Sequence, residues 1–481
     1  MNGWFRGKAS LVIASFAGCC ALLGCSSAST GAGSTAASAG AAPMVVTVSD
    51  APLGNILSAK VTIAGITLGQ GSSGSSASVL AQPETVELSG LGALQEPIEI
   101  TNLAFGTYSS VTLNISAAQV TYINSSGQVT TASASIAQPA VTVALSPALA
   151  VSSQGEVQLQ LAFNLAQSFS ITGSTVTFNP AMNTSGAQVS SENSGDRHVE
   201  VTGAVVAVSS SAITVASGDS SRQFSFTVNS STQFPSGVTI ASIQPASIVQ
   251  VQGQTQTDGT ILAQMITPES QGDSSGQQQD GAKGIIVSVA QDSTGAVTAF
   301  TMVPREGFGA VGATTSISVD VSSATTFDLP EDAQQTGLSS TSFNAAELFP
   351  GQSVLVTGSG GSTGALQAQK IVLAAESIPA SLVAAPVGSS LDYHFTLALP
   401  GTAFLTTYSK ITSLATVAGQ STDYSGSLTA ASFASLAAGA SIEVHGFLLV
   451  DTKGGYTLYA TEIAKVETPE SPESGNSTGD N

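Results

Sequence analysis

The sequence predicts an all-β protein, with an N-terminal β-sandwich followed by about three small five-stranded barrel-like β units. Three observations predict this fold class. Val, Thr and Ile abound between Gly-rich breaks, which favours strands over helices. Apolar and polar residues alternate in many short segments, as half-buried strands require. Only 9% of residues are charged while 42% are hydrophobic, the reverse of a disordered chain, so most of the protein is expected to fold.

The chain begins with a targeting segment. Arg6 and Lys8 precede an apolar run from Ala9 to Leu23 that is too short to span a bilayer as a stable anchor. We therefore expect residues 1–24 to be a cleaved signal peptide rather than a transmembrane helix.

Leu22-Leu-Gly-Cys25, at the end of this apolar run, resembles the lipobox of bacterial lipoproteins. The resemblance implies that the Cys25 thiol is acylated and becomes the first residue of the mature chain, which would hold the protein at a membrane. By the same resemblance, Ser26 rather than Asp implies the outer membrane. Two alternatives stay open: ordinary secretory cleavage that leaves a free cysteine, and acylation at Cys19 after Phe16-Ala-Gly18.

Cysteine use argues against a metal or disulfide site. All three cysteines lie between Cys19 and Cys25 in a chain of 481 residues, and two of them would be removed with the signal peptide. We predict no cofactor.

The charge balance excludes one class of partner. Loss of residues 1–24 leaves 9 basic and 31 acidic residues, a net charge of −22. Nucleic-acid affinity comes mainly from Lys and Arg that replace counterions on phosphates. We therefore predict no nucleic-acid partner.

A flexible tether rich in Ser, Ala and Gly is expected over residues 25–43, and a β-sandwich over residues 44–182. A polar linker, residues 183–198, follows it. The alternating segments that predict the strands of the sandwich are Val45–Ser49, Lys60–Leu68, Val111–Ile115, Val141–Leu145 and Val157–Phe163.

Val48-Ser-Asp-Ala-Pro52 resembles the Ser/Thr-Asp-Ala-Pro signature of a bacterial domain of unknown function, number 4382, found in many lipoproteins. The segments Leu103-Ala-Phe-Gly-Thr-Tyr108, Leu161-Ala-Phe-Asn164 and Phe178-Asn-Pro-Ala181 resemble it in the same order. The resemblance covers roughly residues 44–182. Because the activity of that family is itself unknown, it implies a fold and a location rather than a chemistry.

A second kind of unit recurs after the sandwich. Val249-Gln-Val-Gln-Gly253, Val354-Leu-Val-Thr-Gly358 and Ile442-Glu-Val-His-Gly446 are equivalent strand ends, each followed by a turn and another strand. Five strands per unit suit a small barrel of the oligonucleotide/oligosaccharide-binding (OB) shape. The units resemble another bacterial domain of unknown function, number 5666. We expect them at 199–268, 283–376 and, in divergent form, 377–466, with a linker at 269–282 and a disordered acidic tail at 467–481.

Two glycine motifs are present without the structural context that their chemistry needs. Gly307-Phe-Gly-Ala-Val-Gly312 matches a dinucleotide-binding pattern, but a strand rather than a helix is predicted after it. Gly360-Gly-Ser-Thr-Gly364 matches a nucleophile elbow but lies in a predicted hairpin turn. We interpret both as turns.

The three histidines, His198, His394 and His445, fall in different units without metal-ligand spacing. We interpret His445 as a half-exposed residue of a sheet. Asp392 and His394 are close enough to form a local acid–base pair, although such proximity is common by chance.

Asp50 is the best single candidate for a functional residue. Its carboxylate, at the end of the first strand, is suited to bind Ca²⁺ or a sugar hydroxyl. Alternatively it accepts backbone N–H bonds in a turn completed by Pro52, which we favour because no calcium-loop motif accompanies it.

These observations predict a lipid-anchored, non-catalytic cell-envelope protein that acts as a binding or scaffold module toward glycans or envelope proteins. The sequence presents no catalytic set. A hydrolase whose carboxylate pair converges from distant strands is the alternative. An outer-membrane barrel is disfavoured, since only 5% of residues are aromatic.

Overall fold

A computed structural model describes residues 40–465, apart from 52–54, 72–73, 92–95, 154–155, 190–197, 218–221, 257, 270–279, 312–313, 331–332, 334–335, 337, 339–342, 361–363, 390–391, 426–427 and 451–454. The predictions for the signal peptide, for Cys25 and for the acidic tail concern residues outside this part. The all-β prediction is confirmed: the protein has a β-sandwich, one closed five-stranded barrel and two ring-like sheets.

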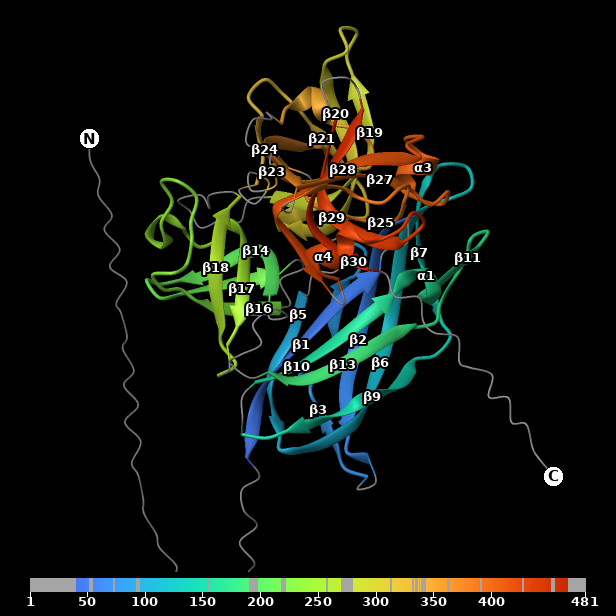
Figure 1. Cartoon of the computed structure of the whole chain (residues 1–481). Helices are drawn as coiled ribbons and strands as arrows, with labels where there is room; N and C mark the ends of the chain where they lie inside the picture. The colour runs from blue at the N-terminus through green and yellow to red at the C-terminus, as the bar shows by residue number, and fades with distance from the viewer. Residues whose placement is uncertain are drawn as a thin grey trace, which may run out of the picture. The chain divides into compact units, whose positions relative to one another are not determined.

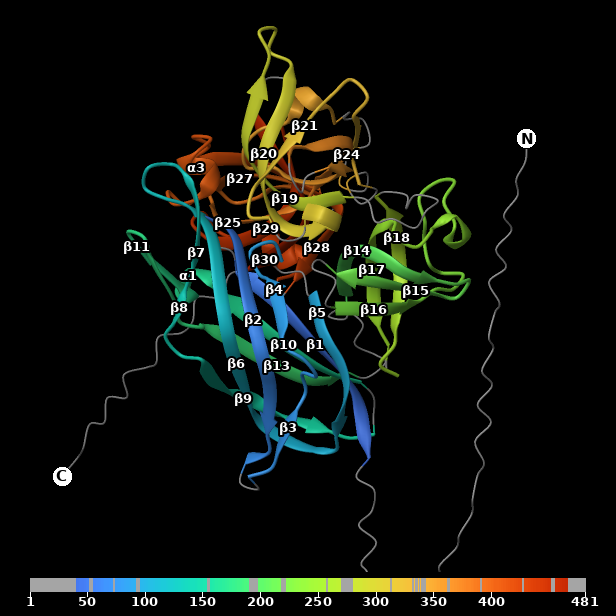
Figure 2. The same cartoon turned by 180° about the vertical axis from the view of Figure 1, so that it is seen from behind.

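Two sheets face each other in the sandwich, residues 40–189; Figure 1 looks onto the first and Figure 2 onto the second. The first has the order β13 (Met182–Val189), β10 (Glu156–Asn164), β1 (Ala41–Ala51) and β5 (Glu96–Ala104). The second is built on β2 (Ile56–Gly69) and β6 (Gly106–Ile123), which pair with β3 (Ser76–Ser78), β4 (Glu84–Glu87), β7 (Val129–Ser133) and β9 (Ala140–Val151). A small third sheet contains β8 (Ser135–Ile136), β11 (Phe169–Thr172) and β12 (Thr175–Phe178).

Alternation places the core of the sandwich. In β10, Val157, Leu159, Leu161 and Phe163 are at most 2% exposed. This strand pairs in parallel with β1 and antiparallel with β13, so it lies inside the sheet. Burial of this apolar face against the second sheet supplies the main stabilisation, because no disulfide links the described residues.

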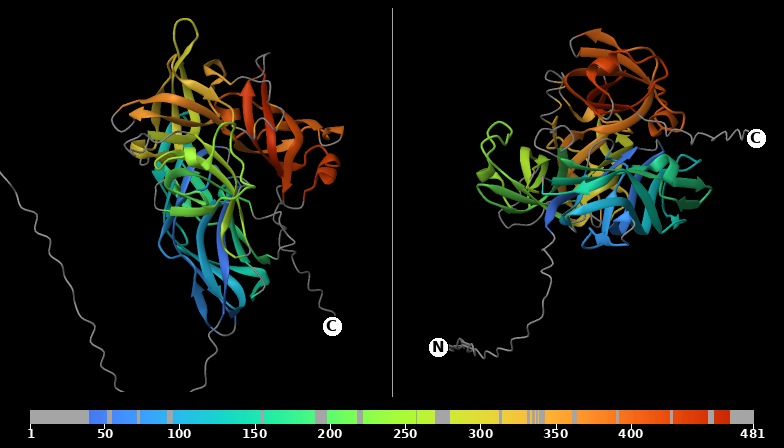
Figure 3. Two further views of the ribbon diagram at one scale, coloured as in Figure 1. Left: turned by 90° about the vertical axis from the view of Figure 1, so that its left-hand side faces the viewer. Right: turned by 60° about the horizontal axis from the view of Figure 1, so that its bottom comes forward.

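The first barrel, residues 198–269, closes in the order β14 (His198–Val208), β15 (Ala212–Ser217), β16 (Arg222–Thr227), β18 (Ile261–Pro268) and β17 (Ile248–Thr255). Its third and fifth strands pair in parallel, Phe226 with Ile261, and this pairing closes the barrel. The barrel appears green in both views of Figure 3.

The second ring, residues 280–374, repeats this order of pairing with β19 (Asp280–Gln291), β20 (Val297–Phe308), β21 (Ile317–Asp320), β24 (Leu366–Ala374) and β23 (Ser353–Gly360). The third ring, residues 376–465, repeats it with β25 (Glu376–Leu382), β27 (Asp392–Ala398), β28 (Ser413–Ser425), β30 (Tyr456–Lys465) and β29 (Ser441–Val450). In both, the third strand again pairs in parallel with the fifth. β22 (Thr326–Asp328) and β26 (Val387–Ser389) are additional edge strands.

The helices are short. They are α1 (Leu165–Ser168), α3 (Phe404–Thr407) and α4 (Ala430–Ala434), with 3₁₀ turns at Ile240–Ser242, Gly309–Val311 and Ala345–Glu347. Among the described residues no helix is both long and apolar enough to cross a membrane.

A glycine marks the same bulge in all three barrel-like units. The register shifts at Gly253, Gly358 and Gly446, each in the fourth strand of its unit. At Gly358 and Gly446 an added Cβ would meet the carbonyl oxygen of the neighbouring strand, from Gln367 and Tyr459 respectively. Glycine is therefore needed where the sheet bends to close.

Three boundaries differ from those expected. β1 begins within the predicted tether, β19 begins at Asp280 within the predicted 269–282 linker, and β13 covers most of the first half of the predicted 183–198 linker. Asn183-Thr-Ser-Gly186 carries no apolar alternation, yet its backbone completes the sheet beside β10. Strand pairing supplies the order here, so composition alone missed it.

Candidate functional site

A small cavity, here called the junction cavity, lies where the sandwich, the first barrel and the second ring meet. Charged side chains from all three surround it. Its charged lining residues are Glu87 and Glu96 of the sandwich, Glu200 of the first barrel, and Lys283, Arg305 and Glu306 of the second ring. Its volume of about 40 Å³ has room for two or three water molecules and none for a sugar ring.

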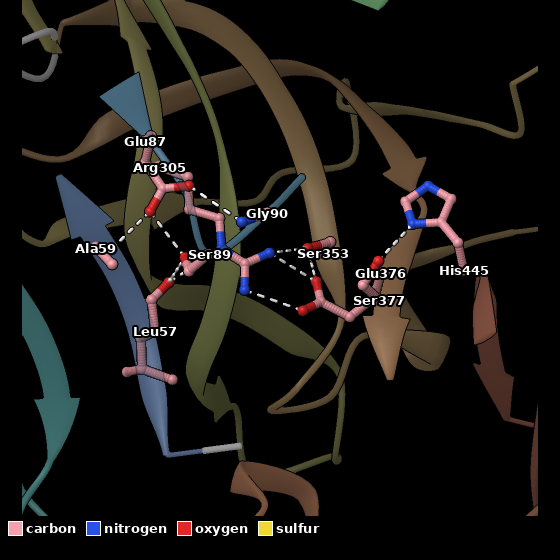
Figure 4. A network of polar contacts seen from close by, with 10 residues as sticks. All are labelled: Leu57, Ala59, Glu87, Ser89, Gly90, Arg305, Ser353, Glu376, Ser377 and His445. Carbon is pink, nitrogen blue, oxygen red and sulfur yellow. Dashed lines mark hydrogen bonds and ion pairs between the residues drawn. The ribbon is translucent and has the colours of Figure 1, made fainter. Parts of the chain in front are cut away.

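Arg305 is the central cation of this junction (Figure 4). It extends from β20, is 7% exposed, and donates from Nε to the Leu57 carbonyl of the sandwich at 3.0 Å. Its two terminal nitrogens donate to the two oxygens of Glu376, at 2.8 and 2.9 Å. Glu376 opens the third ring and also accepts from Ser353 Oγ. One guanidinium therefore joins the sandwich, the second ring and the third ring, by the bidentate geometry that makes such pairs strong.

Glu87 is held within the sandwich. Its oxygens accept the backbone N–H of Ala59 at 2.7 Å and of Gly90 at 3.1 Å, and a bond from Ser89 Oγ at 2.7 Å. Figure 4 shows these bonds beside Arg305. Because its carboxylate is saturated by local donors, Glu87 is fixed at the wall of the cavity.

The first barrel is joined to its neighbours by four ion pairs. Arg222 Nη2 lies 2.6 Å from Glu96 of the sandwich, and its Nε lies 3.8 Å from Glu84. Arg222 Nη1 also donates to the Pro97 carbonyl at 3.3 Å. Lys283 of the second ring lies 3.7 Å from Glu200. Lys370 of the second ring lies 3.3 Å from the buried Glu269, whose pKa is raised by burial despite this lysine.

These pairs use most of the available cations. The described part of the chain contains the basic residues Lys60, Arg222, Lys283, Arg305, Lys370, Lys410 and Lys465, and four of these seven bridge different units. A protein with few charges thus places most of its positive charge at internal boundaries.

Apolar clusters cover the same boundaries. Leu57 and Ile123 of the sandwich pack with Val303 of the second ring and Phe404 of the third. Ile248 of the first barrel packs with Phe308 of the second ring. The pairs of Arg222 and Arg305 are therefore shielded from water, which strengthens them and raises the cost of breaking one. Lys283 and Lys370 keep about a quarter of their side chains exposed.

Glu306 differs from the other carboxylates of the cavity. Its Oε2 is buried and has no hydrogen-bond partner among the described residues. Burial raises the pKa of Glu306 to about 7, Lys283 opposes this shift, and the charges of Glu96 and Glu87 add to it. A carboxyl group with this pKa can hold or release a proton near neutral pH.

A second buried polar group lies on β25 and β29. Ser377 Oγ and His445 Nδ1 are 2.9 Å apart (Figure 4), and both residues are at most 8% exposed. Burial lowers the pKa of His445 to about 4, and burial also raises the pKa of the neighbouring Glu443 to about 8, helped by the charge of Glu462. A serine and a histidine at this depth have no path to a polymeric substrate, so we do not interpret them as a nucleophile and base.

The expectation that His445 is half-exposed was wrong. β29 turns Ile442 and Val444 toward the core of the third ring, while Phe447 and Leu449 on its other face pack into the core of the second ring. His445 shares that other face and is buried by the same contact. Both faces of the strand are covered, which a sequence pattern read one unit at a time does not show.

The structure does not bring the remaining predicted site residues together. Asp50 lies in β1 with its backbone paired to Phe163, and its side chain and that of His198 fall outside the described part. His394 and Asp392 are 3.6 Å apart and both about two-thirds exposed, as in an ordinary surface pair. Among the described residues, no group of three His, Cys, Asp or Glu side chains is placed to hold a metal ion.

Both glycine motifs lie in connections between strands. The first runs from the end of β20 through the 3₁₀ turn Gly309–Val311 toward β21, with no α-helix to meet a pyrophosphate in the described residues. The second joins β23 to β24, and its residues 361–363 lie outside the described part.

Comparison with known families identifies two segments. Residues 41–180 match the Domain of unknown function (DUF4382), and residues 202–267 match the Domain of unknown function (DUF5666). The first match agrees with the resemblance of the Asp50 segment, and the second with that of the first barrel. A search of curated proteins gave no match.

Two solved structures of the single-stranded DNA-binding protein from Thermus aquaticus are similar in part. A deletion mutant is 14% identical, covering 40% of this chain and 97% of that one, with a TM-score of 0.18. The wild-type protein is 13% identical, covering 40% and 94%, with a TM-score of 0.17. These scores are too low to support an inference about this chain.

Arg305→Met is expected to lower the free energy of unfolding by about 3–5 kcal/mol, because it leaves Glu376 buried without its cation. Calorimetry should also show the unfolding transition split, since the sandwich and the rings lose their shared contact. Adding Glu376→Met should restore part of the loss. Lys410→Met, which removes an exposed lysine that donates to the Thr407 carbonyl, should change little. If Lys410→Met lowered the free energy of unfolding as much as Arg305→Met, this role for Arg305 would be contradicted.

The stability of the protein should fall between pH 6.5 and pH 8, and Glu443 should be the main cause. Its pKa is about 8 in the folded protein against 4.5 unfolded, so the unfolded state releases its proton first and gains relative stability as the pH rises. His445 acts only below pH 6.5, with the opposite sign. Urea unfolding should give a loss of about 2 kcal/mol across this window. Glu443→Gln should remove most of it, whereas Glu99→Gln should not; an unchanged slope in Glu443→Gln would refute the assignment.

Proposed function

We propose that this protein is a lipid-anchored, non-catalytic scaffold or binding module of the bacterial cell envelope, with acylated Cys25 as its anchor. The observation that carries the proposal is the use of charge at the junction. Four of the seven described basic residues form ion pairs between units, and the cavity they surround admits only a few water molecules. Such a site favours holding several β units in one body over turning over a substrate.

The outer face of the first barrel is the favoured ligand surface. Along β15 and β16 the outward side chains include Thr214, Gln223, Ser225 and Thr227, and Thr214 is 2.8 Å from Ser225. The second and third strands form the ligand face of OB-type barrels, an argument by analogy of fold. Uncharged hydroxyl and amide groups suit the hydroxyls of a glycan. They offer neither the cations nor the aromatic rings that hold single-stranded nucleic acid.

A hydrolase remains the second candidate because one observation favours it. Glu306 has a buried oxygen with no hydrogen-bond partner among the residues described. Its pKa is about 7 and it lies near other carboxylates, as the general acid of a carboxylate pair does. The volume of the cavity counts against this candidate, since a sugar ring would enter only after the units had separated.

Metabolic labelling with a palmitate analogue tests the anchor. The wild-type chain should incorporate the label and fractionate with membranes, and Cys25→Ala should do neither, because an acyl chain attached to a cysteine thiol is the proposed attachment. Cys19→Ala is the matched control and should label normally. Labelling that persists in Cys25→Ala would contradict the proposed anchor.

Glycan arrays and pull-downs from envelope extracts, with the full chain carrying Cys25→Ala, test the binding role. Gln223→Ala with Ser225→Ala should weaken a retained glycan about tenfold or more, because two hydrogen-bonding side chains are removed. The matched pair Ser116→Ala with Gln119→Ala, on an exposed part of β6, should not. Product formation that Glu306→Gln abolishes would favour the hydrolase, and no ligand under any condition would reject the binding role.

A further inference from the structure

The junction carries more negative than positive charge. Its ion pairs and cavity walls contain six carboxylates, Glu84, Glu87, Glu96, Glu200, Glu306 and Glu376, against three cations, Arg222, Lys283 and Arg305. Glu96 and Glu376 are each bound tightly by an arginine, and Glu87 by backbone donors. Glu84 and Glu200 form longer ion pairs, with Arg222 at 3.8 Å and with Lys283 at 3.7 Å. Among the carboxylates of the cavity that the structure describes, Glu306 has a buried oxygen without a hydrogen-bond partner, so we assign the excess charge to it.

Charged groups from several described strands act on Glu306 or line its cavity. The charged groups around it are Lys283 on β19, Arg305 on its own strand β20, Arg222 on β16, Glu200 on β14, Glu87 on β4 and Glu96 on β5. These strands belong to the sandwich, the first barrel and the second ring. The charge state of Glu306 thus acts on the boundary between three units at once.

We propose that protonation of Glu306 controls the opening of the junction, so that the three units hold together around the neutral carboxyl group and separate more readily around the carboxylate. Such control would regulate how rigidly the scaffold holds its units. Only this regulatory role rests on the proposed function; the opening itself does not. Separation lets water reach the Glu306 Oε2 atom, which has no hydrogen-bond partner within the part of the chain that the structure describes.

The direction of the pH dependence follows from linkage. Glu306 has a pKa of about 7 in the closed junction, and its ordinary value is 4.5 once water surrounds it. The open state therefore releases the proton at lower pH, and the equilibrium constant for opening rises by up to about tenfold for each pH unit between 4.5 and 7. Above pH 7 both states are ionised and the dependence levels off.

His445 would give the opposite sign. Burial lowers its pKa from 6.5 to about 4, so a boundary controlled by His445 would loosen as the pH falls below 6.5. If opening increases between pH 5 and pH 7, the controlling group is therefore Glu306 and not His445.

Thiol labelling tests the proposal because residues 26–481 contain no cysteine. Thr202 lines the cavity and is 5% exposed, while Ser225 is exposed on the same barrel. In the full chain carrying Cys19→Ala, Cys20→Ala and Cys25→Ala, Thr202→Cys reports opening and Ser225→Cys corrects for the reactivity of an exposed thiol at each pH. The ratio of the two iodoacetamide rates should rise by up to about a hundredfold from pH 5 to pH 7 and then level off.

Glu306→Gln keeps the size of the side chain and cannot ionise, so the ratio should stay near its pH 5 value, within about twofold, at every pH. Glu347→Gln removes another glutamate of the second ring whose pKa is raised by burial but which does not line the cavity, and should behave as wild type. Ser217→Cys, also in the cavity wall, serves if Thr202→Cys does not fold.

Three results would overturn the proposal: a flat ratio in the unsubstituted background, the same pH dependence in Glu306→Gln, or a ratio that rises as the pH falls. Addition of K⁺ or Ca²⁺ at pH 7.5 gives a further outcome. If either ion suppresses labelling only when Glu306 is present, the cavity is a cation site rather than a proton-controlled junction. The labelling needs no ligand, so its result is independent of whether glycan binding is found.

Discussion

The way the β units of this chain pack together depends on its small number of positive charges. A carboxylate removed from water must receive a cation or several hydrogen-bond donors, or else retain its proton. The mature chain would have only nine basic residues against 31 acidic ones. Arg222 and Arg305, the two arginines in the described part, both form ion pairs with carboxylates at unit boundaries. Glu306 and Glu443, which these arginines do not pair with, have raised pKa values. Packing between the units and proton uptake by the junction are therefore two consequences of one constraint.

Most of the fold could be predicted from the sequence because its information is local. Alternation in Val157–Phe163 marks a strand whichever strand it pairs with, and Gly253 and Gly358 mark bends because a side chain there has no room. β13 was missed for the complementary reason: its polar residues become a strand only because β10 offers an unpaired edge. Local patterns thus predict strands but not which polar segment completes a sheet.

The junction could not be predicted because its members are far apart in the chain. Arg305 is separated from Leu57 by 248 positions and from Glu376 by 71. One signal was nevertheless available. In a chain with 9% charged residues, a charge inside an apolar strand needs an internal partner, as at Glu443 and at the adjacent residues Arg305 and Glu306. Arg305, Glu306 and Glu443 match no catalytic motif, so the sequence predicts no site at them.

The three barrel-like units show how one topology acquires different roles. The fourth strand places Gln250 and Gln252 outward in the first barrel, where both are half-buried. The equivalent positions hold Leu355 and Thr357 in the second ring and Glu443 and His445 in the third, all buried. The inward positions stay apolar in all three, so the units differ in what their outer face contacts rather than in how they fold. Burial of the outer face thus distinguishes the second and third rings from the first barrel. The outward side chains of β16 in that barrel, Gln223, Ser225 and Thr227, are polar and exposed, which leaves a surface to offer a ligand.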